Sequence, residues 1–203
     1  RSGNWADEYI TEGHIFYDQV LRLWALRCYQ AIQPSKAVSE KIDAIKTIIE
    51  ANYTKGKNLH PYHPRAYKSL SNKPYWMASI NPSGYQTMFD AFGNSIALLL
   101  ELGDDTFRTN QIIYMEKLRK SLKLKLLPAF WDPIFPEDEQ WKLLENNCKY
   151  EFRNIPYEFH NGGTWQMVNG FYSMSISEEK PDVAEEIIAG IEMLNSEEGY
   201  SFY

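Results

Sequence analysis

Hydrophobic residues recur at spacings of three and four along most of the chain, which is the pattern of amphipathic helices. One such segment covers residues 15–32 and ends before Pro34, because the residue before a proline is disfavoured in a helix. A second segment, 35–53, begins at Ser35, a residue favoured at helix N-caps. Since the connection between the two segments is very short, we expect them to form a helical hairpin.

The same spacing predicts further helices over residues 89–102, 104–122, 137–147, 164–177 and 181–195. Strand-like alternation is scarce, and the stretches 54–87 and 127–136, rich in proline and aromatic residues, are expected to be long irregular loops. About seven helices result, paired by short turns and joined elsewhere by long loops. The fold class predicted is all-α: an incomplete toroid of helical hairpins whose long loops gather at one end to form a cleft.

Composition and charge narrow the classes of ligand. The 203 residues are 44% hydrophobic and 24% charged, the proportions of a soluble globular protein. A net charge of −6, with no stripe of Lys and Arg, disfavours nucleic acid and anionic membranes as partners. No apolar run approaches the roughly 18 residues that span a bilayer. The 15% aromatic content exceeds the needs of a small core and indicates planar faces lining a ligand cleft, for which sugar rings are natural ligands.

Cysteine and histidine give no sign of a metal or cofactor. Cys28 and Cys148 cannot form a multi-disulfide scaffold, and we expect both in the core. His60 and His63 have no Cys or acidic partner at ligand spacing, so no metal site is predicted. Low cysteine use is compatible with the cytoplasm, while a periplasmic or secreted location stays open.

Two carboxylates stand beside an indole in the stretch Trp5-Ala6-Asp7-Glu8, just before the first predicted helix. A carboxyl group in a dry, aromatic setting keeps its proton near neutral pH, which acid catalysis requires. Trp5 would supply that setting for Asp7. The alternative is that Asp7, Glu8 and Glu12 are solvated acids near the N-terminus of the following helix, where they favour its dipole.

The tract 156–165 contains a second group of candidates. Its candidate residues are Tyr157, His160, Asn161, Gly162, Gly163 and Trp165. The two glycines permit close approach of the backbone, while the other side chains offer hydrogen bonds and a stacking face, as a polyol site requires. The alternative is a structural turn around a hydrogen-bonded histidine. Trp131 is suited equally to core packing and to lining a cleft, and Asp90 is expected to cap or support the helix predicted at 89–102.

The order of four tracts resembles the catalytic helical domain of the neutral/alkaline invertases and of the related amylo-alpha-1,6-glucosidase-like proteins. The tracts are residues 2–7 with 21–27, 88–97, 127–131 and 157–165. The most specific is His-Asn-Gly-Gly-Thr-Trp at 160–165. In those enzymes Pro usually follows the Trp, whereas Gln166 follows it here.

This resemblance implies an (α/α)6 toroid that hydrolyses a glycosidic bond with inversion, acting on an α-glucoside in a disaccharide or short oligosaccharide. Asp7 matches the general acid of the family. The substrate-binding residues implied are Trp5, Trp131, Tyr157, His160, Asn161, Gly162, Gly163 and Trp165. The general base is expected to be a Glu just after Tyr203, since residues 199–203 begin the family's aromatic motif; Glu197 and Glu198 are less favoured substitutes.

The resemblance further implies that residues 1–203 are a single helical domain, the C-terminal part of a longer catalytic domain, inactive without the rest. A catalytically silent carbohydrate-binding domain is the main alternative. A helical interaction scaffold would bury its aromatic residues and bind no sugar. A sugar isomerase or epimerase would need several histidines around its cavity, and only His160 lies in a suitable tract.

Overall fold

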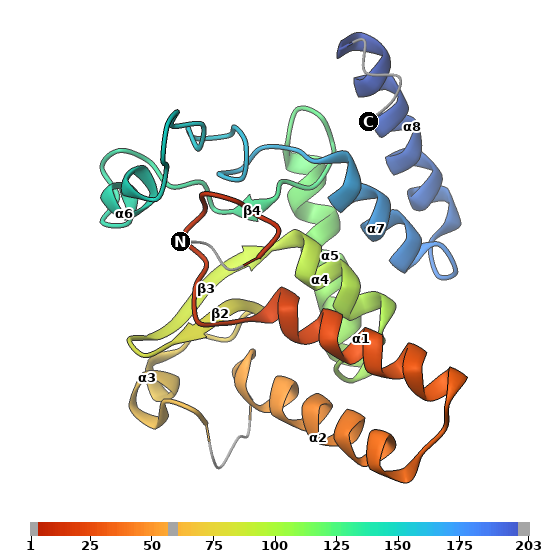
Figure 1. Ribbon diagram of the computed structural model, residues 1–203. Helices are drawn as coiled ribbons and strands as arrows, with labels where there is room; N and C mark the ends of the chain where they lie inside the picture. Colours follow the sequence, from red (N-terminus) through yellow and green to blue (C-terminus); the bar gives the residue numbers. More distant parts are fainter. Residues whose placement is uncertain (1–3, 57–60, 199–203) are drawn as a thin grey trace.

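The computed structural model describes residues 4–56 and 61–198, which adopt a mixed α/β fold (Figure 1). The helices are α1 (Phe16–Ile32), α2 (Lys36–Asn52), α3 (Pro64–Ser69), α4 (Ala91–Leu99), α5 (Asp105–Ser121), α6 (Trp141–Asn146), α7 (Gln166–Ile176) and α8 (Pro181–Glu198). The strands are β1 (His14–Ile15), β2 (Met77–Asn81), β3 (Gly84–Asp90) and β4 (Phe130–Trp131).

The helices predicted from hydrophobic spacing are confirmed, with ends displaced by a few residues. Ser35 caps α2, because its side chain accepts a hydrogen bond of 3.2 Å from the Val38 amide. Asp104 caps α5 in the same way, accepting 2.7 Å from the Phe107 amide. Short polar caps therefore fix where these helices begin.

The predictions of an all-α fold and of an (α/α)6 toroid are wrong. Residues 77–90, most of which were expected to be loop, form the hairpin of β2 and β3 in a four-stranded antiparallel sheet of order β1-β2-β3-β4. The turn is fixed by the Asn81 side chain, which accepts from the amides of Ser83 at 2.9 Å and Gly84 at 3.1 Å. All five residues of β2 are buried, so this strand lacks the alternation of a half-exposed strand.

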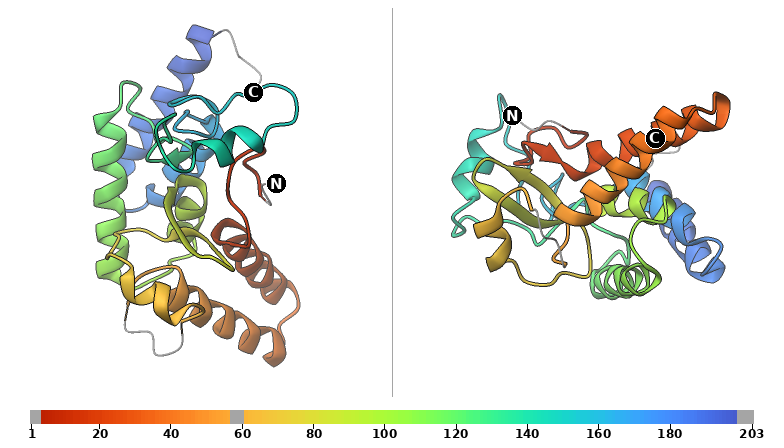
Figure 2. Two further views of the ribbon diagram at one scale, coloured as in Figure 1. Left: turned by 90° about the vertical axis from the view of Figure 1, so that its left-hand side faces the viewer. Right: turned by 90° about the horizontal axis from the view of Figure 1, so that it is seen from below.

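The helices α2, α1, α4, α7 and α8 pack against one another in that order. Figure 2 shows α5 along the side of the molecule away from α1 and α2. Residues 91–98 of α4 are buried, as its nearly continuous apolar sequence predicts, and the larger hydrophobic core surrounds this helix. A smaller core lies beneath the N-terminal segment and contains Tyr9 and Phe130.

The two cysteines differ in exposure. Cys28 is exposed on α1, so the prediction that it lies in the core is wrong; Cys148 is partly buried. None of the helices in the described part of the chain is long and apolar enough to cross a membrane.

Gly13 joins the segment that carries Asp7 to strand β1. Its φ of +82° lies in the left-handed region, and a Cβ atom added here would lie 2.4 Å from the carbonyl oxygen of Ile80. Only glycine therefore lets the chain pass this close to β2.

We predict that Gly13→Ala lowers the free energy of unfolding by at least about 2 kcal/mol, because left-handed strain and the clash with β2 add. The control is Gly170→Ala within α7, where an added Cβ meets nothing within 4 Å. This control should raise stability by about 0.5–1 kcal/mol through helix propensity. Urea denaturation measures the free energy of unfolding of both variants. Equal effects of the two substitutions would contradict the role of Gly13.

Candidate functional site

Three distant side chains hold consecutive carbonyl groups of the segment 4–11, called here the N-terminal loop. The donors lie 138 to 153 residues along the chain from the carbonyls that they bind. His160 Nδ1 binds the Asp7 carbonyl at 2.9 Å, Asn154 Nδ2 the Glu8 carbonyl at 3.0 Å, and Asn147 Nδ2 the Tyr9 carbonyl at 2.6 Å. We call Asn147, Asn154 and His160 the clamp.

The clamp residues are themselves ordered by further bonds. The Asn154 side-chain oxygen accepts a hydrogen bond of 3.1 Å from the His160 backbone amide. Because a carbonyl oxygen only accepts, the bond to Asp7 requires the proton of His160 on Nδ1. The clamp therefore fixes both the backbone of the loop and the tautomer of the histidine.

Asp7 has a fixed backbone but an exposed side chain. The next residue, Glu8, has a φ of +61°, a strained conformation for a residue with a side chain. Trp5 packs against other rings, while the Asp7 carboxyl faces solvent. The described part of the chain thus gives Asp7 the surroundings of a solvated acid, the alternative considered from the sequence.

Three of the predicted site residues, Trp5, His160 and Trp165, do come together. His160 stacks on Trp165 with ring centroids 4.8 Å apart, and the edge of Trp5 meets both rings, at 5.2 Å from His160 and 5.8 Å from Trp165. Phe92, Phe130 and Phe159 complete this aromatic cluster. The cluster lies behind the Asp7 backbone and links the N-terminal loop to the tract predicted from the sequence.

Asn161 and the two glycines of that tract have clear structural roles. The Asn161 side chain bonds both the amide and the carbonyl of Ile134, at 2.7 and 2.8 Å, and is fully buried. A Cβ on Gly163 would lie 2.3 Å from the Phe159 carbonyl, and a Cβ on Gly162 would lie 2.8 Å from Pro133. The predicted close backbone approach is therefore present, within the protein itself.

Trp131 and Tyr157 lie together at a different place. Their ring centroids are 6.1 Å apart, and Tyr157 is 56% exposed. Successive residues of a strand point to opposite faces, so Trp131 faces away from its neighbour Phe130, which stacks on Trp5. Trp131 lines a separate cavity of about 440 Å³ together with Lys73 and other residues. The structure thus divides the predicted sugar-binding residues between two places.

Asp90 is a buried carboxyl group beside the aromatic cluster. One of its oxygens caps α4, accepting from the amides of Phe92 at 3.1 Å and Gly93 at 3.2 Å, which confirms the predicted capping role. The other oxygen has no partner among the described protein groups. Burial raises the pKa of Asp90 to about 7, against the lowering effect of the two amide bonds.

His160 is only 2% exposed, and burial lowers the pKa of its imidazole to about 4 despite the bond to the Asp7 carbonyl. Tyr9 lies on Phe130, and burial, with the nearby charge of Asp90 as a second cause, raises the pKa of its phenol. Burial therefore shifts all three groups toward their neutral forms, whereas the Asp7 side chain is exposed.

Neither Asn147 nor Asn154 is a candidate from the sequence alone. A single asparagine in a polar stretch carries no periodic signal, and only the folded chain brings these two near the N-terminal loop. Residues 199–203 and His60 lie outside the described residues. Within the described ranges, no group of three or more His, Cys, Asp and Glu side chains is arranged to hold a metal ion.

Comparison with models of known protein families gives no match to this sequence, and comparison with curated proteins gives none either.

We predict that the neutral His160 stabilises the fold above its ordinary pKa of 6.5 and that this stability is lost as the pH falls toward 4. The reason is that the unfolded chain binds a proton more readily than the folded one. His160→Gln removes this titration. The stability advantage of the wild type over the variant should shrink by up to about 3 kcal/mol between pH 7 and pH 4. Parallel stability curves in urea would contradict the prediction.

Asp90 should make the stability of the fold change with pH in the opposite direction, because its folded-state pKa is raised from 3.8 to about 7. The protonated form is favoured by folding, so its stability is present below pH 4 and is lost as the pH rises through 7. Asp90→Asn keeps an oxygen to cap α4. We expect its stability relative to the wild type to rise by a few kcal/mol, on the order of 3, between pH 4 and pH 8.

Asp104→Asn, which removes the exposed capping carboxylate of α5, is the matched control in the same denaturation series. The two capping variants should differ in how their effects depend on pH. An Asp90→Asn effect that follows that of Asp104→Asn at every pH would show that burial does not raise the pKa of Asp90.

Proposed function

We propose that this chain supplies the acid-bearing part of the active site of a glycoside hydrolase. The reaction is inverting hydrolysis of an α-glucoside in a disaccharide or short oligosaccharide, with Asp7 as the general acid. The observation that carries the proposal is the clamp, which fixes the backbone at Asp7 while its side chain stays accessible. A general acid must be held in place and still reach the oxygen that it protonates.

In the proposed reaction Asp7 gives its proton to the glycosidic oxygen as the bond to the anomeric carbon breaks. A water molecule attacks that carbon from the opposite face and loses a proton to a second carboxylate. Inversion requires the two carboxyl groups to be about 6.5–9.5 Å apart. The resemblance assigns the base to a Glu beyond Tyr203, and no described residue is proposed for this step.

His160 and Asn161 are proposed as positioning residues rather than as contacts to the sugar. His160 acts on the Asp7 carbonyl, and Asn161 holds the backbone at Ile134 and Asn154. Trp131 and Tyr157 offer a separate aromatic surface, suited to a neighbouring sugar unit because a sugar ring stacks on an exposed aromatic face.

A carbohydrate-binding domain without catalysis is the second candidate. The exposure of Asp7 favours it, because the side chain lacks the dry, aromatic setting that acid catalysis requires. On this alternative, sugars bind at Trp131 and Tyr157 and no bond is cleaved.

The test is Asp7→Asn in the natural full-length protein. With maltose-like substrates we expect kcat to fall by roughly 10²- to 10⁴-fold, because protonation of the leaving oxygen is lost. With α-glucosyl fluoride the loss should be far smaller, since fluoride leaves without protonation. The control is Asp43→Asn, the same change at an exposed position on α2, which should leave both rates unchanged.

Proton NMR identifies the first sugar released, and the β anomer is expected from an α-glucoside. Equal losses on both substrates would contradict the role of Asp7 as general acid. Binding of oligosaccharide without turnover by the wild type would instead support the carbohydrate-binding domain.

A further inference from the structure

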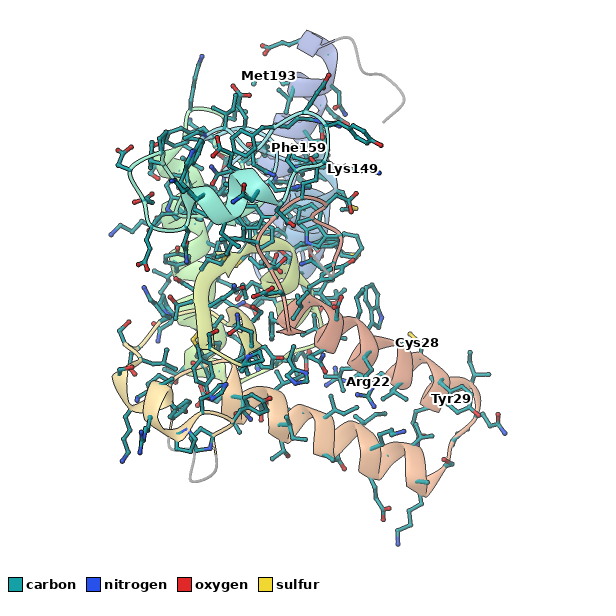
Figure 3. All side chains as sticks on the ribbon, turned by 60° about the vertical axis from the view of Figure 1, so that its left-hand side comes forward. Arg22, Cys28, Tyr29, Lys149, Phe159 and Met193 are labelled. Atoms are coloured by element: carbon teal, nitrogen blue, oxygen red, sulfur yellow. The ribbon has the colours of Figure 1, made fainter. Side chains whose placement is uncertain are left out.

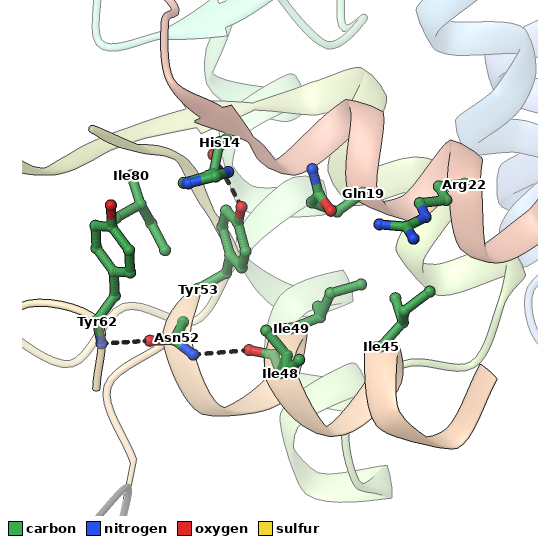
Figure 4. Close-up of a pocket in the computed structure, with 10 residues that line it drawn as sticks. All are labelled: His14, Gln19, Arg22, Ile45, Ile48, Ile49, Asn52, Tyr53, Tyr62 and Ile80. Carbon is green, nitrogen blue, oxygen red and sulfur yellow. Dashed lines mark hydrogen bonds between the residues drawn. The ribbon is translucent and has the colours of Figure 1, made fainter. Parts of the chain in front are cut away.

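A pocket of about 320 Å³ opens between α1 and α2, beside the start of the sheet (Figure 4). It is lined by His14, Gln19, Arg22, Ile45, Ile48, Ile49, Asn52, Tyr53, Tyr62 and Ile80. This pocket lies apart from the proposed active site. Figure 3 shows Arg22 between α1 and α2, whereas Phe159 of the aromatic cluster lies toward the other end of the molecule.

The two sides of the pocket differ in chemistry. Gln19 and Arg22 lie one turn apart on α1 and point toward α2, as Figure 4 shows. The facing side is made of isoleucine side chains of α2, including Ile48, which is 59% exposed. A ligand that fits both sides has one polar edge and one apolar body.

The far end of the pocket is fixed by hydrogen bonds within the protein. The Tyr53 hydroxyl donates to the His14 carbonyl at 2.8 Å, and the Asn52 side chain accepts from the Tyr62 amide at 2.8 Å. The rings of His14 and Tyr62 meet edge to face at 5.5 Å. This end is therefore formed before any ligand binds, which reduces the entropic cost of binding.

Arg22 supplies the charge that selects the ligand. Within residues 4–56 and 61–198, no hydrogen bond or ion pair is found for its guanidinium group, and none of the ten lining residues is acidic. A guanidinium group matches a carboxylate with two parallel hydrogen bonds. Arg22 is exposed, so the pairing gains more from the geometry of these two hydrogen bonds than from exclusion of water.

We propose that this pocket binds a small organic carboxylate with a compact apolar body. The carboxylate pairs with Arg22, Gln19 donates a further hydrogen bond, and the body packs on Ile45, Ile48 and Ile49. A sugar is a poor fit, because the isoleucine side offers its hydroxyl groups no partner. The site is independent of the proposed hydrolysis, so either inference can fail without the other.

The experiment compares 4-phenylbutyrate with 4-phenyl-1-butanol, which has the same body without the charge. Titration of ¹⁵N-labelled full chain is followed by NMR. The acid should shift signals of α1 and α2 and bind about tenfold or more tightly than the alcohol. Arg22→Gln should remove that difference, while Arg65→Gln, at an exposed position outside the pocket, should keep it.

Ile48→Asn provides a second variant, and because Ile48 is 59% exposed the substitution is compatible with folding. It should weaken both compounds by a similar factor, about three- to tenfold, because it removes apolar contact and leaves the charge. Equal binding of acid and alcohol to the wild type would overturn the proposal. So would an acid preference that persists in Arg22→Gln, or the absence of any shift in α1 and α2.

Discussion

Three side-chain hydrogen bonds to consecutive carbonyl groups hold the N-terminal loop, and the arrangement around Asp7 depends on them. The segment 4–11 contains no helix or strand, so its backbone groups need partners from elsewhere. Asn147, Asn154 and His160 supply these partners from 138 to 153 residues further along the chain. Once the loop is held, Trp5 and Tyr9 can pack on Phe130 and close the smaller core.

The same arrangement leaves the carboxyl group of Asp7 exposed and buries two other ionisable groups nearby. His160 and Asp90 lie inside, and desolvation favours the neutral form of each, whereas the Asp7 carboxyl faces water. Their opposite pH trends partly offset each other between pH 4 and pH 7, because folding disfavours a proton on His160 and favours one on Asp90. A fixed backbone with one accessible carboxyl group is a sound basis for acid catalysis, and equally for holding a sugar hydroxyl.

Apart from α3, which lies in a stretch expected to be loop, the described helices were predictable. Each buries one face or, for α4, nearly its whole surface, and Ser35, Asp90 and Asp104 mark where helices begin. The sheet was not. Strand β2 is buried along its full length and shows no alternation, while β1 and β4 have two residues each, too few for any period. The turn at residues 81–84 was the available signal for the hairpin.

The candidate site was predictable in part. Trp5, His160 and Trp165, which the resemblance assigned to one site, pack together, and the glycines permit close backbone approach. The position of the Trp131 side chain could not be predicted from the sequence, because the face of the sheet on which a residue lies depends on strand register. Asn147 and Asn154 act over 138 and 146 residues, a separation at which no local pattern carries information.

Hydrogen exchange of the N-terminal loop, followed by mass spectrometry, tests the clamp most directly. Asn154→Ala removes the bonds to Glu8 and to the His160 amide, so amides of residues 5–11 should exchange at least about tenfold faster, as expected for local opening. Exchange in α5 should stay at its wild-type rate. Unchanged exchange in the loop, or equal acceleration throughout the chain, would contradict the central role of the clamp.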